Sequence, residues 1–355
     1  MQIIVLGSHR SGTSLVTRLI NMMGAYFAIG DTALGANNEN PKGFWERWDV
    51  IAANDEILSH YGCEWDKLQH WKFVDTVAKK DATALKETDE KIKKIILELD
   101  ANRPWVIKDP RMCLTFPYWK KHLEVPVIVA VYRNPLEIAR SLKTRNEFSF
   151  SHSMALWEYY ATGMANAVKD TPTVWVSHED MLSNPVDTVK KLHDDLQKLD
   201  VTGLRMPNEK EITSFIDPTL YRSKDKKETL DEMITDYQKR LMGYVSAKDT
   251  VPKALQQPTE LAQDLMQSLE AYRSLNQKME VQNQKFSDMQ QHQHELEAAL
   301  EATEGNENLI AEKYQKLIDK EKAEQEFLRN STSWKLGNSI VNFFRAITFT
   351  RSKAE

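Results

Sequence analysis

The chain has 355 residues, of which 41% are hydrophobic, and this length allows one core of ordinary size plus an appendage. Its formal net charge of −5 gives no reason to expect nucleic acid as a partner. The only two cysteines, Cys63 and Cys113, lack metal-ligand spacing and indicate reduced thiols. No stretch reaches the roughly eighteen apolar residues of a membrane-spanning helix, and the first apolar run is too short for a signal peptide. We therefore expect a cytoplasmic protein.

Apolar runs alternate with helical patterns over the first two thirds of the chain. Because this order is typical of a parallel sheet covered by helices on both faces, we predict an α/β fold with three layers and a central parallel sheet over residues 1–250. The expected strands are at about 2–6, 105–108, 126–132 and 173–177, and the expected helices are near 13–24, 48–60, 84–100, 135–146, 152–169 and 185–198.

A glycine-rich loop, GSHRSGTS at residues 7–14, separates the first predicted strand from the first predicted helix. Gly7 and Gly12 allow the backbone to turn successive N–H groups toward an anion at the positive end of the helix that opens near Thr13. The lysine that clamps nucleoside triphosphates is missing after the second glycine, and the cation is Arg10, inside the loop. The segment predicts a site for a 5′-phosphate that carries another transferable group. The alternative is a turn that binds nothing.

Two charged segments follow before the third predicted strand. NPKGFWE, residues 40–46, ends in an acid shortly after a Pro/Gly turn, and WVIKDPR, residues 105–111, is a short apolar strand that ends in a charged loop. Charged residues at the carboxyl end of a strand favour a ligand site. The alternatives are a solvated acid on a surface turn and a surface ion-pair cluster that contributes little.

The third predicted strand, 125–132, also ends in a cation. Arg133 follows it directly, and an Asn-Pro pair then supplies an N-cap and a first helical residue. Ser141 and Arg145 are four residues apart in that helix and share one face. Arg133, Ser141 and Arg145 are therefore predicted donors to one more phosphate at the carboxyl edge of the sheet.

The loop at residues 7–14 and the segment from Arg133 to Arg145 are the two predicted phosphate segments. Together they resemble the sulfotransferase family, whose P-loop-like members use 3′-phosphoadenosine 5′-phosphosulfate as donor. Arginine at the loop's cation position is similar to the branch that contains tyrosylprotein and many bacterial glycan sulfotransferases. The family's 3′-phosphate site has an arginine and a serine eight positions apart, matched by Arg133 and Ser141, with Arg145 nearby. Its 5′-phosphosulfate loop reads Lys or Arg, Ser, Gly, Thr, then Ser or Thr, matched by Arg10, Ser11, Gly12, Thr13 and Ser14.

The resemblance also implies catalytic residues. Glu46 would be the base that takes the proton of the acceptor hydroxyl, which is a poor nucleophile until that proton leaves. Lys108 would join Arg10 in stabilising charge on the sulfuryl group and the leaving phosphate. Glu39, His9 and Asp109 are the rival bases. No metal is required in this scheme.

Three further features are assigned with less specificity. The segment 174–185, VWVSHEDMLSNP, resembles the late strand of the family and the loop that starts the following helix. The segment 221–223 falls where related enzymes often return residues to the nucleotide. The aromatic residues Trp157, Tyr159 and Tyr160 have helical spacing, which is more typical of a core than of a stacking site.

The chain changes character beyond Pro258, where a heptad pattern runs from Leu265 to Leu328. We predict a coiled coil over 259–329 and a homo-oligomer formed through it, the alternative being a long helix folded back on the first domain. Polar residues such as Gln293 interrupt the seam, and Gly305 weakens its middle. One seam position holds Leu265, Tyr272, Met279, Phe286, Leu300, Tyr314 and Leu328, and the other holds Leu275, Met289, Leu296, Ile310 and Leu317.

The last segment, 331–350, is predicted to be an amphipathic helix that binds an anionic membrane surface or a protein partner. Apolar residues from Leu336 to Ile347 have helical spacing, cations lie nearby, and the segment resembles the SWKL-type tail of bacterial surface-polysaccharide enzymes. A peripheral location at the inner face of the membrane follows from this prediction.

These resemblances imply a sulfotransferase that acts on a hydroxyl of a glycan or lipid-linked saccharide. Two other functions stay open at this point. One is a metal-dependent nucleotide kinase with a degenerate phosphate loop. The other is a non-catalytic scaffold in which the coiled coil organises glycan-assembly enzymes.

Overall fold

The computed structural model describes residues 1–28, 32–35, 43–73, 79–216, 234–247, 257–302, 308–331 and 335. The chain divides into two compact units, Met1–Met266 and Gln267–Glu355. The predictions made for Glu39, for residues 221–223 and for residues 336–350 lie outside the described residues.

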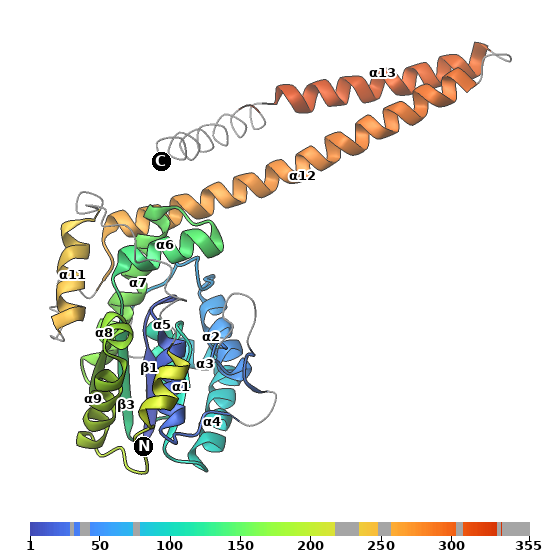
Figure 1. Ribbon diagram of the computed structural model, residues 1–355. Coiled ribbons are helices and arrows are strands. Elements are labelled where there is room, and N and C mark those ends of the chain that lie inside the picture. Colours follow the sequence, from blue (N-terminus) through green and yellow to red (C-terminus); the bar gives the residue numbers. More distant parts are fainter. Residues whose placement is uncertain are drawn as a thin grey trace. The chain divides into compact units, whose positions relative to one another are not determined.

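A four-stranded parallel sheet forms the centre of the first unit (Figure 1). Its strands are β1 (Gln2–Leu6), β2 (Trp105–Lys108), β3 (Pro126–Tyr132) and β4 (Thr173–Ser177), in the order β2-β1-β3-β4. These bounds confirm the four predicted strands and the α/β class. The strand β2 lies on one side of β1, and the next strand along the chain, β3, lies on the other side. The strand order therefore reverses between β1 and β3. Ligands of open α/β sheets bind at such a switch point.

Helices cover both faces of this sheet because the side chains of β1 alternate between two cores. Ile4 and Leu6 belong to one core, and Ile3 and Val5 belong to the other. The first core is covered by α2 (Trp48–His60), α4 (Lys86–Asp100), α5 (Met112–Lys120), α6 (Pro135–Asn146) and α7 (Phe150–Val168). The second is covered by α1 (Thr13–Met22), α8 (His178–Ser183), α9 (Pro185–Lys198) and α10 (Glu209–Phe215).

Helix boundaries differ from the prediction in a few places. The helix expected near 84–100 is preceded by a separate short helix, α3 (Lys79–Ala84). The sequence patterns did not reveal α5, α8, α10 and α11 (Asp236–Ala247). Three of these have fewer than ten residues, too few for an apolar period to repeat, and α5 contains Pro117, a residue that normally argues against a helix. Trp157, Tyr159 and Tyr160 are buried in α7, as expected of core residues.

The start of the long helix α12 (Glu260–Ala302) belongs to the first unit. Glu158 of α7 is fully buried and accepts hydrogen bonds from the backbone N–H and the hydroxyl of Thr259. Gln238 of α11 donates a third hydrogen bond to the same carboxyl. Ala262 and Met266 are buried in the first core. The first turns of α12 are therefore part of the α/β unit rather than of the second unit.

The second unit contains the rest of α12 and α13 (Asn308–Asn330), which pair as antiparallel helices. Gln325 donates to Gln293 at 3.3 Å, and Lys322 lies 3.4 Å from Glu297. The polar side chain of Gln293, which interrupts the heptad pattern, is thus matched by another polar side chain across the pair.

The heptad register predicted for this unit describes α12 better than α13. Met279 and Leu296 in α12 are each 8% exposed, as expected of seam residues. In α13, however, Ile318 is 2% exposed whereas the predicted seam residue Leu317 is 43% exposed. The difference arises because α13 is a separate helix, so its phase follows its own contact with α12 and not the continuation of one heptad count. No described helix is long and apolar enough to cross a bilayer.

Candidate active site

The loop between β1 and α1 has a backbone that only glycine fits at two positions. Gly12 has a φ of +93°, and a Cβ atom there would lie 2.3 Å from Cδ2 of His178. A Cβ atom at Gly7 would lie 2.7 Å from the carbonyl oxygen of Val131 on β3. The hydroxyl of Ser11 donates to the carbonyl of Ser8 at 2.7 Å and closes the turn. The loop therefore packs tightly against the ends of β3 and β4 and delivers its N–H groups at the start of α1.

The two predicted phosphate segments meet in the structure. Arg133 Nη1 donates to the carbonyl oxygen of Arg10 at 2.9 Å, and Arg10 Nε donates to Ser141 Oγ at 2.9 Å. Arg133 Nε also donates to Glu137 at 2.9 Å, which holds its guanidinium at the end of β3. Residues separated by more than a hundred positions thus share one hydrogen-bond network, because β1 and β3 are neighbours with their carboxyl ends at the same edge.

Lys108 and Glu46 join the same loop. Lys108, at the end of β2, is only 1% exposed, and its Nζ forms an ion pair with Glu46 Oε1. The same Nζ lies 3.2 Å from the hydroxyl of Ser14 at the start of α1. The structure therefore brings the predicted base and the predicted charge-stabilising lysine into direct contact beside the loop after β1.

A buried arginine next to Glu46 fixes the position of that segment. Arg47 is 1% exposed and donates to both carboxyl oxygens of Asp49, at 3.0 and 2.7 Å, and to Glu98 of α4. Tyr26 donates to Glu98 at 3.0 Å from the other side. Since a buried guanidinium is costly to move away from its carboxylates, Arg47 anchors the residue before it.

Four cations from three segments surround His9. Burial lowers the pKa of the His9 imidazole well below its ordinary value, and the positive charges of Arg111, Lys108, Arg145 and Arg10 lower it further. These four come from the β1 loop, from β2 and the turn after it, and from α6. Their convergence creates a positive potential suited to an anion with several charges.

Asp109, predicted from the sequence as a rival base, accepts hydrogen bonds from neighbouring side chains and backbone. It is fully buried and accepts hydrogen bonds from Asn54 at 3.0 Å and from the backbone and side chain of Arg111, each at 3.0 Å. Arg111 also lies 2.7 Å from Asp55. The carboxylate of Asp109 therefore shapes the turn after β2 and holds Arg111 in place.

His178 was not among the site residues predicted from the sequence. It opens α8 directly after β4 and packs against Gly12. Burial, with the nearby charge of Arg133, lowers the pKa of His178 to about 3, so the ring is neutral. Its signal in the sequence was the same one that revealed Arg133, a polar residue at the carboxyl end of a buried strand.

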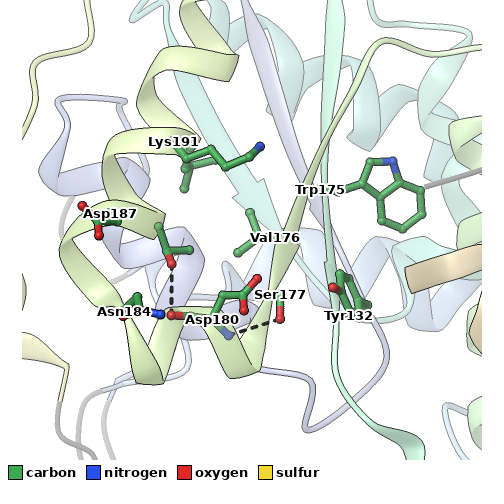
Figure 2. Close-up of a pocket in the computed structure, with 10 residues that line it drawn as sticks. Tyr132, Trp175, Val176, Ser177, Asp180, Asn184, Asp187 and Lys191 are labelled. Carbon is green, nitrogen blue, oxygen red and sulfur yellow. Dashed lines mark hydrogen bonds between the residues drawn. The ribbon is translucent and has the colours of Figure 1, made fainter. Parts of the chain in front are cut away.

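A hollow of about 330 Å³ lies beside the edge strand β4. Figure 2 shows Tyr132 and Trp175 on one side of it, and Asp180, Asn184 and Lys191 on the other. Tyr132 and Ser177 line it one residue before Arg133 and His178. Among the described residues no cluster of three or more His, Cys, Asp or Glu side chains could hold a metal ion.

A comparison with models of known protein families identifies one family. A family model described as "Sulfotransferase family" matches residues 2–199. None of the curated proteins matches this sequence.

Three solved structures are similar at low identity. The sulfotransferase domain from the Synechococcus PCC 7002 olefin synthase has a TM-score of 0.41 at 13% identity, over 71% of this chain and 96% of its own. The sulfotransferase domain from the curacin biosynthetic pathway has a TM-score of 0.41 at 14% identity, over 70% and 98%. Sulfotransferase STF9 from Mycobacterium avium has a TM-score of 0.38 at 13% identity, over 71% and 77%.

Proposed function

The chain belongs to the sulfotransferase family, and on this premise we propose that it transfers a sulfuryl group to a hydroxyl of a glycan or lipid-linked saccharide. The family implies 3′-phosphoadenosine 5′-phosphosulfate as the donor. The observation that carries the proposal is the shared network of Arg10, Arg133 and Ser141 at the switch point of the sheet.

The residues present fit such a donor. The glycines of the β1 loop leave no room for a Cβ atom, and the loop's N–H groups with Arg10 would hold the 5′-phosphosulfate. Arg133 and Ser141, with Arg145 on the same helix, would hold the 3′-phosphate. The donor supplies the sulfuryl group and a phosphate that leaves with the electron pair of the broken S–O bond.

The ion pair of Lys108 and Glu46 suits the remaining roles. Lys108 would stabilise charge on the sulfuryl oxygens and the leaving phosphate. Glu46, half of that ion pair, would take the proton from the acceptor hydroxyl as the new S–O bond forms. Binding of an anionic donor beside Lys108 would compete with Glu46 for the ammonium group and would leave the carboxylate available to the acceptor.

The direct experiment is incubation of the full chain with labelled donor and saccharide fractions, followed by mass spectrometry for the added sulfuryl group. We expect sulfated saccharide to form in the presence of EDTA. A strict Mg²⁺ requirement with turnover of ATP would identify a nucleotide kinase instead. Cellular function that persists after loss of Arg10 and Glu46 would identify a scaffold.

We also propose that the C-terminal part localises and assembles the enzyme. Val281 of α12 and Phe327 of α13 are 54% and 75% exposed although they are large and apolar, which supports a further contact between helix pairs of two chains. The segment 331–350 would bind anionic lipid at the inner face of the membrane, or a glycan-assembly enzyme.

Shortened chains test this division. A chain of residues 1–270 keeps Thr259 and Met266, which the first unit needs, and should be monomeric in light scattering while it still binds donor. A chain that ends at residue 330 should no longer sediment with anionic vesicles. A monomeric full-length chain would refute the oligomer, and a chain of residues 1–330 that still sediments with lipid would refute the membrane segment.

A further inference from the structure

Arg10, Lys108, Arg111 and Arg145, the four cations around His9, form a cation cluster. Half-buried aromatic side chains line one side of this cluster. The ring of Trp65 lies 4.6 Å from the ring of His9 and is stacked at 5.8 Å on Phe148, the latter in the turn between α6 and α7. We name His9, Trp65 and Phe148 the aromatic wall. It begins inside the phosphate loop itself, because His9 is the residue before Arg10.

Hydrogen bonds determine which nitrogen of His9 carries the proton. The hydroxyl of Tyr160 donates its single proton to the carbonyl oxygen of Trp65 at 2.8 Å. Nε2 of His9 lies 3.1 Å from the same hydroxyl, so Nε2 must donate to it. Nδ1 therefore carries a lone pair, and no donor among the described residues reaches that lone pair.

The charges around the ring keep His9 in this form. Arg10 lies in its own loop, Lys108 and Arg111 on and after β2, and Arg145 on α6, while Tyr160 of α7 is the polar group packed against it. Burial and these four cations lower the pKa of the imidazole, so Nδ1 is a neutral hydrogen-bond acceptor at physiological pH. A neutral acceptor flanked by aromatic rings is suited to a hydroxyl group and not to an anion.

We propose that the aromatic wall is the acceptor subsite, that a saccharide ring packs its C–H groups on Trp65 and Phe148, and that a second hydroxyl of the same ring donates to His9 Nδ1. This inference rests on the proposed function and names how the acceptor is recognised. His9, at one end of the wall, lies among the cations that would hold the donor. A saccharide ring on the wall would therefore place one of its hydroxyls near the sulfuryl group.

The combination favours a saccharide over a simple phenol or alcohol. A pyranose ring presents an apolar face and, at its edge, neighbouring hydroxyls of which one can react while the other is recognised. A phenol has no second hydroxyl to donate to Nδ1. Sites built to hydrogen-bond a hydroxyl discriminate against analogues that lack it, since the buried acceptor is then left without a partner.

Four variants test the wall. Trp65→Leu removes the stacking surface but keeps the backbone carbonyl that accepts from Tyr160. His9→Leu removes Nδ1, whereas His9→Asn restores an acceptor atom near the same place. Trp48→Leu is the matched control, because Trp48 is 54% exposed and lies outside the wall.

The probes are chitotriose and maltotriose, their deoxy analogues, and p-nitrophenol. Trp65→Leu should raise KM for the trisaccharides about tenfold or more while the Kd for adenosine 3′,5′-bisphosphate stays unchanged. His9→Leu should raise KM for the hydroxylated probes by up to about tenfold but not for the deoxy analogues, and His9→Asn should recover part of the loss. Trp48→Leu should match the wild type.

Equal KM values for wild type, Trp65→Leu and His9→Leu would overturn the inference, as would preference of the wild type for p-nitrophenol. Failure of the proposed function gives a different result, the absence of sulfated product from the wild type with every probe. In that case saccharide binding is measured directly by ligand-observed NMR in the presence of adenosine 3′,5′-bisphosphate. Loss of that binding in Trp65→Leu supports the wall, and binding that the variant retains refutes it.

Discussion

The loop end of the sheet and the helix pair of the second unit both contain polar side chains in partly buried positions, but they use them differently. In the helix pair, Gln293 meets Gln325 and Glu297 meets Lys322, so each of these four side chains has a partner of matching chemistry. At the sheet edge, four cations from three segments gather around the neutral imidazole of His9. Two of these cations already pair with carboxylates, Lys108 with Glu46 and Arg111 with Asp109 and Asp55, and the clustering of four cations still creates a positive potential suited to an anionic ligand. The first arrangement serves structure, and the second indicates a ligand.

Removal of the predicted base, Glu46, should have the largest effect. Glu46→Gln keeps the size of the side chain and removes its basicity, so turnover should fall by about 10² to 10⁴ while the Kd for adenosine 3′,5′-bisphosphate stays near the wild-type value. Kinetics and calorimetry on the same preparation provide the measurement. Glu64→Gln, at a 60% exposed surface ion pair, is the control. Full activity of Glu46→Gln would reassign the base.

A second neutral histidine at the site, His178, should make the stability of the first unit sensitive to acid. The pKa of His178 is about 3 in the folded chain against an ordinary value of 6.5, so its contribution to stability is present above pH 6.5 and is lost as the pH falls toward 3. The free energy of unfolding should decrease in this window with an extra slope of up to about 1.4 kcal/mol per pH unit. In His178→Phe this extra slope should vanish. Denaturant melts at several pH values measure it, and identical slopes would contradict the assignment.

The predicted 3′-phosphate site should select nucleotides by their phosphates. Because Arg133 and Ser141 would hold the 3′-phosphate, adenosine 3′,5′-bisphosphate should bind about ten- to a hundredfold more tightly than adenosine 5′-monophosphate, also in EDTA. Isothermal titration calorimetry measures both affinities. Arg133→Gln should remove most of the difference, whereas Arg329→Gln in α13 should not. Equal affinity of the wild type for the two nucleotides would refute the donor assignment.

The smallest expected effect concerns the seam of α13. Ile318→Ala should destabilise the helix pair by about 2 kcal/mol, since Ile318 is 2% exposed. Leu317→Ala, at the neighbouring position, should change its stability by less than about 0.5 kcal/mol. Hydrogen exchange of the amides in α12 and α13 locates the change, and donor binding should be unaffected in both variants. A larger effect of Leu317→Ala would restore the uninterrupted heptad register.

Local patterns in the sequence determined the elements that depend on near neighbours. The four strands followed from apolar runs, the bounds of α2, α6 and α9 from periodicity and caps, and the tight loop after β1 from its glycines. The seam of α12 followed from heptad spacing. Each of these depends on contacts within a few residues, which a one-dimensional pattern records.

The contacts between distant segments depend on the tertiary structure. The pairing of Glu46 with Lys108, the hydrogen bond of Arg10 to Ser141 and the packing of His178 against Gly12 join residues 62 or more positions apart. The phase of α13 also depended on its partner helix and not on its own sequence. The order of strands in the sheet and the pairing of helices determine which distant residues are in contact. The spacing of residues along one segment does not predict either of them.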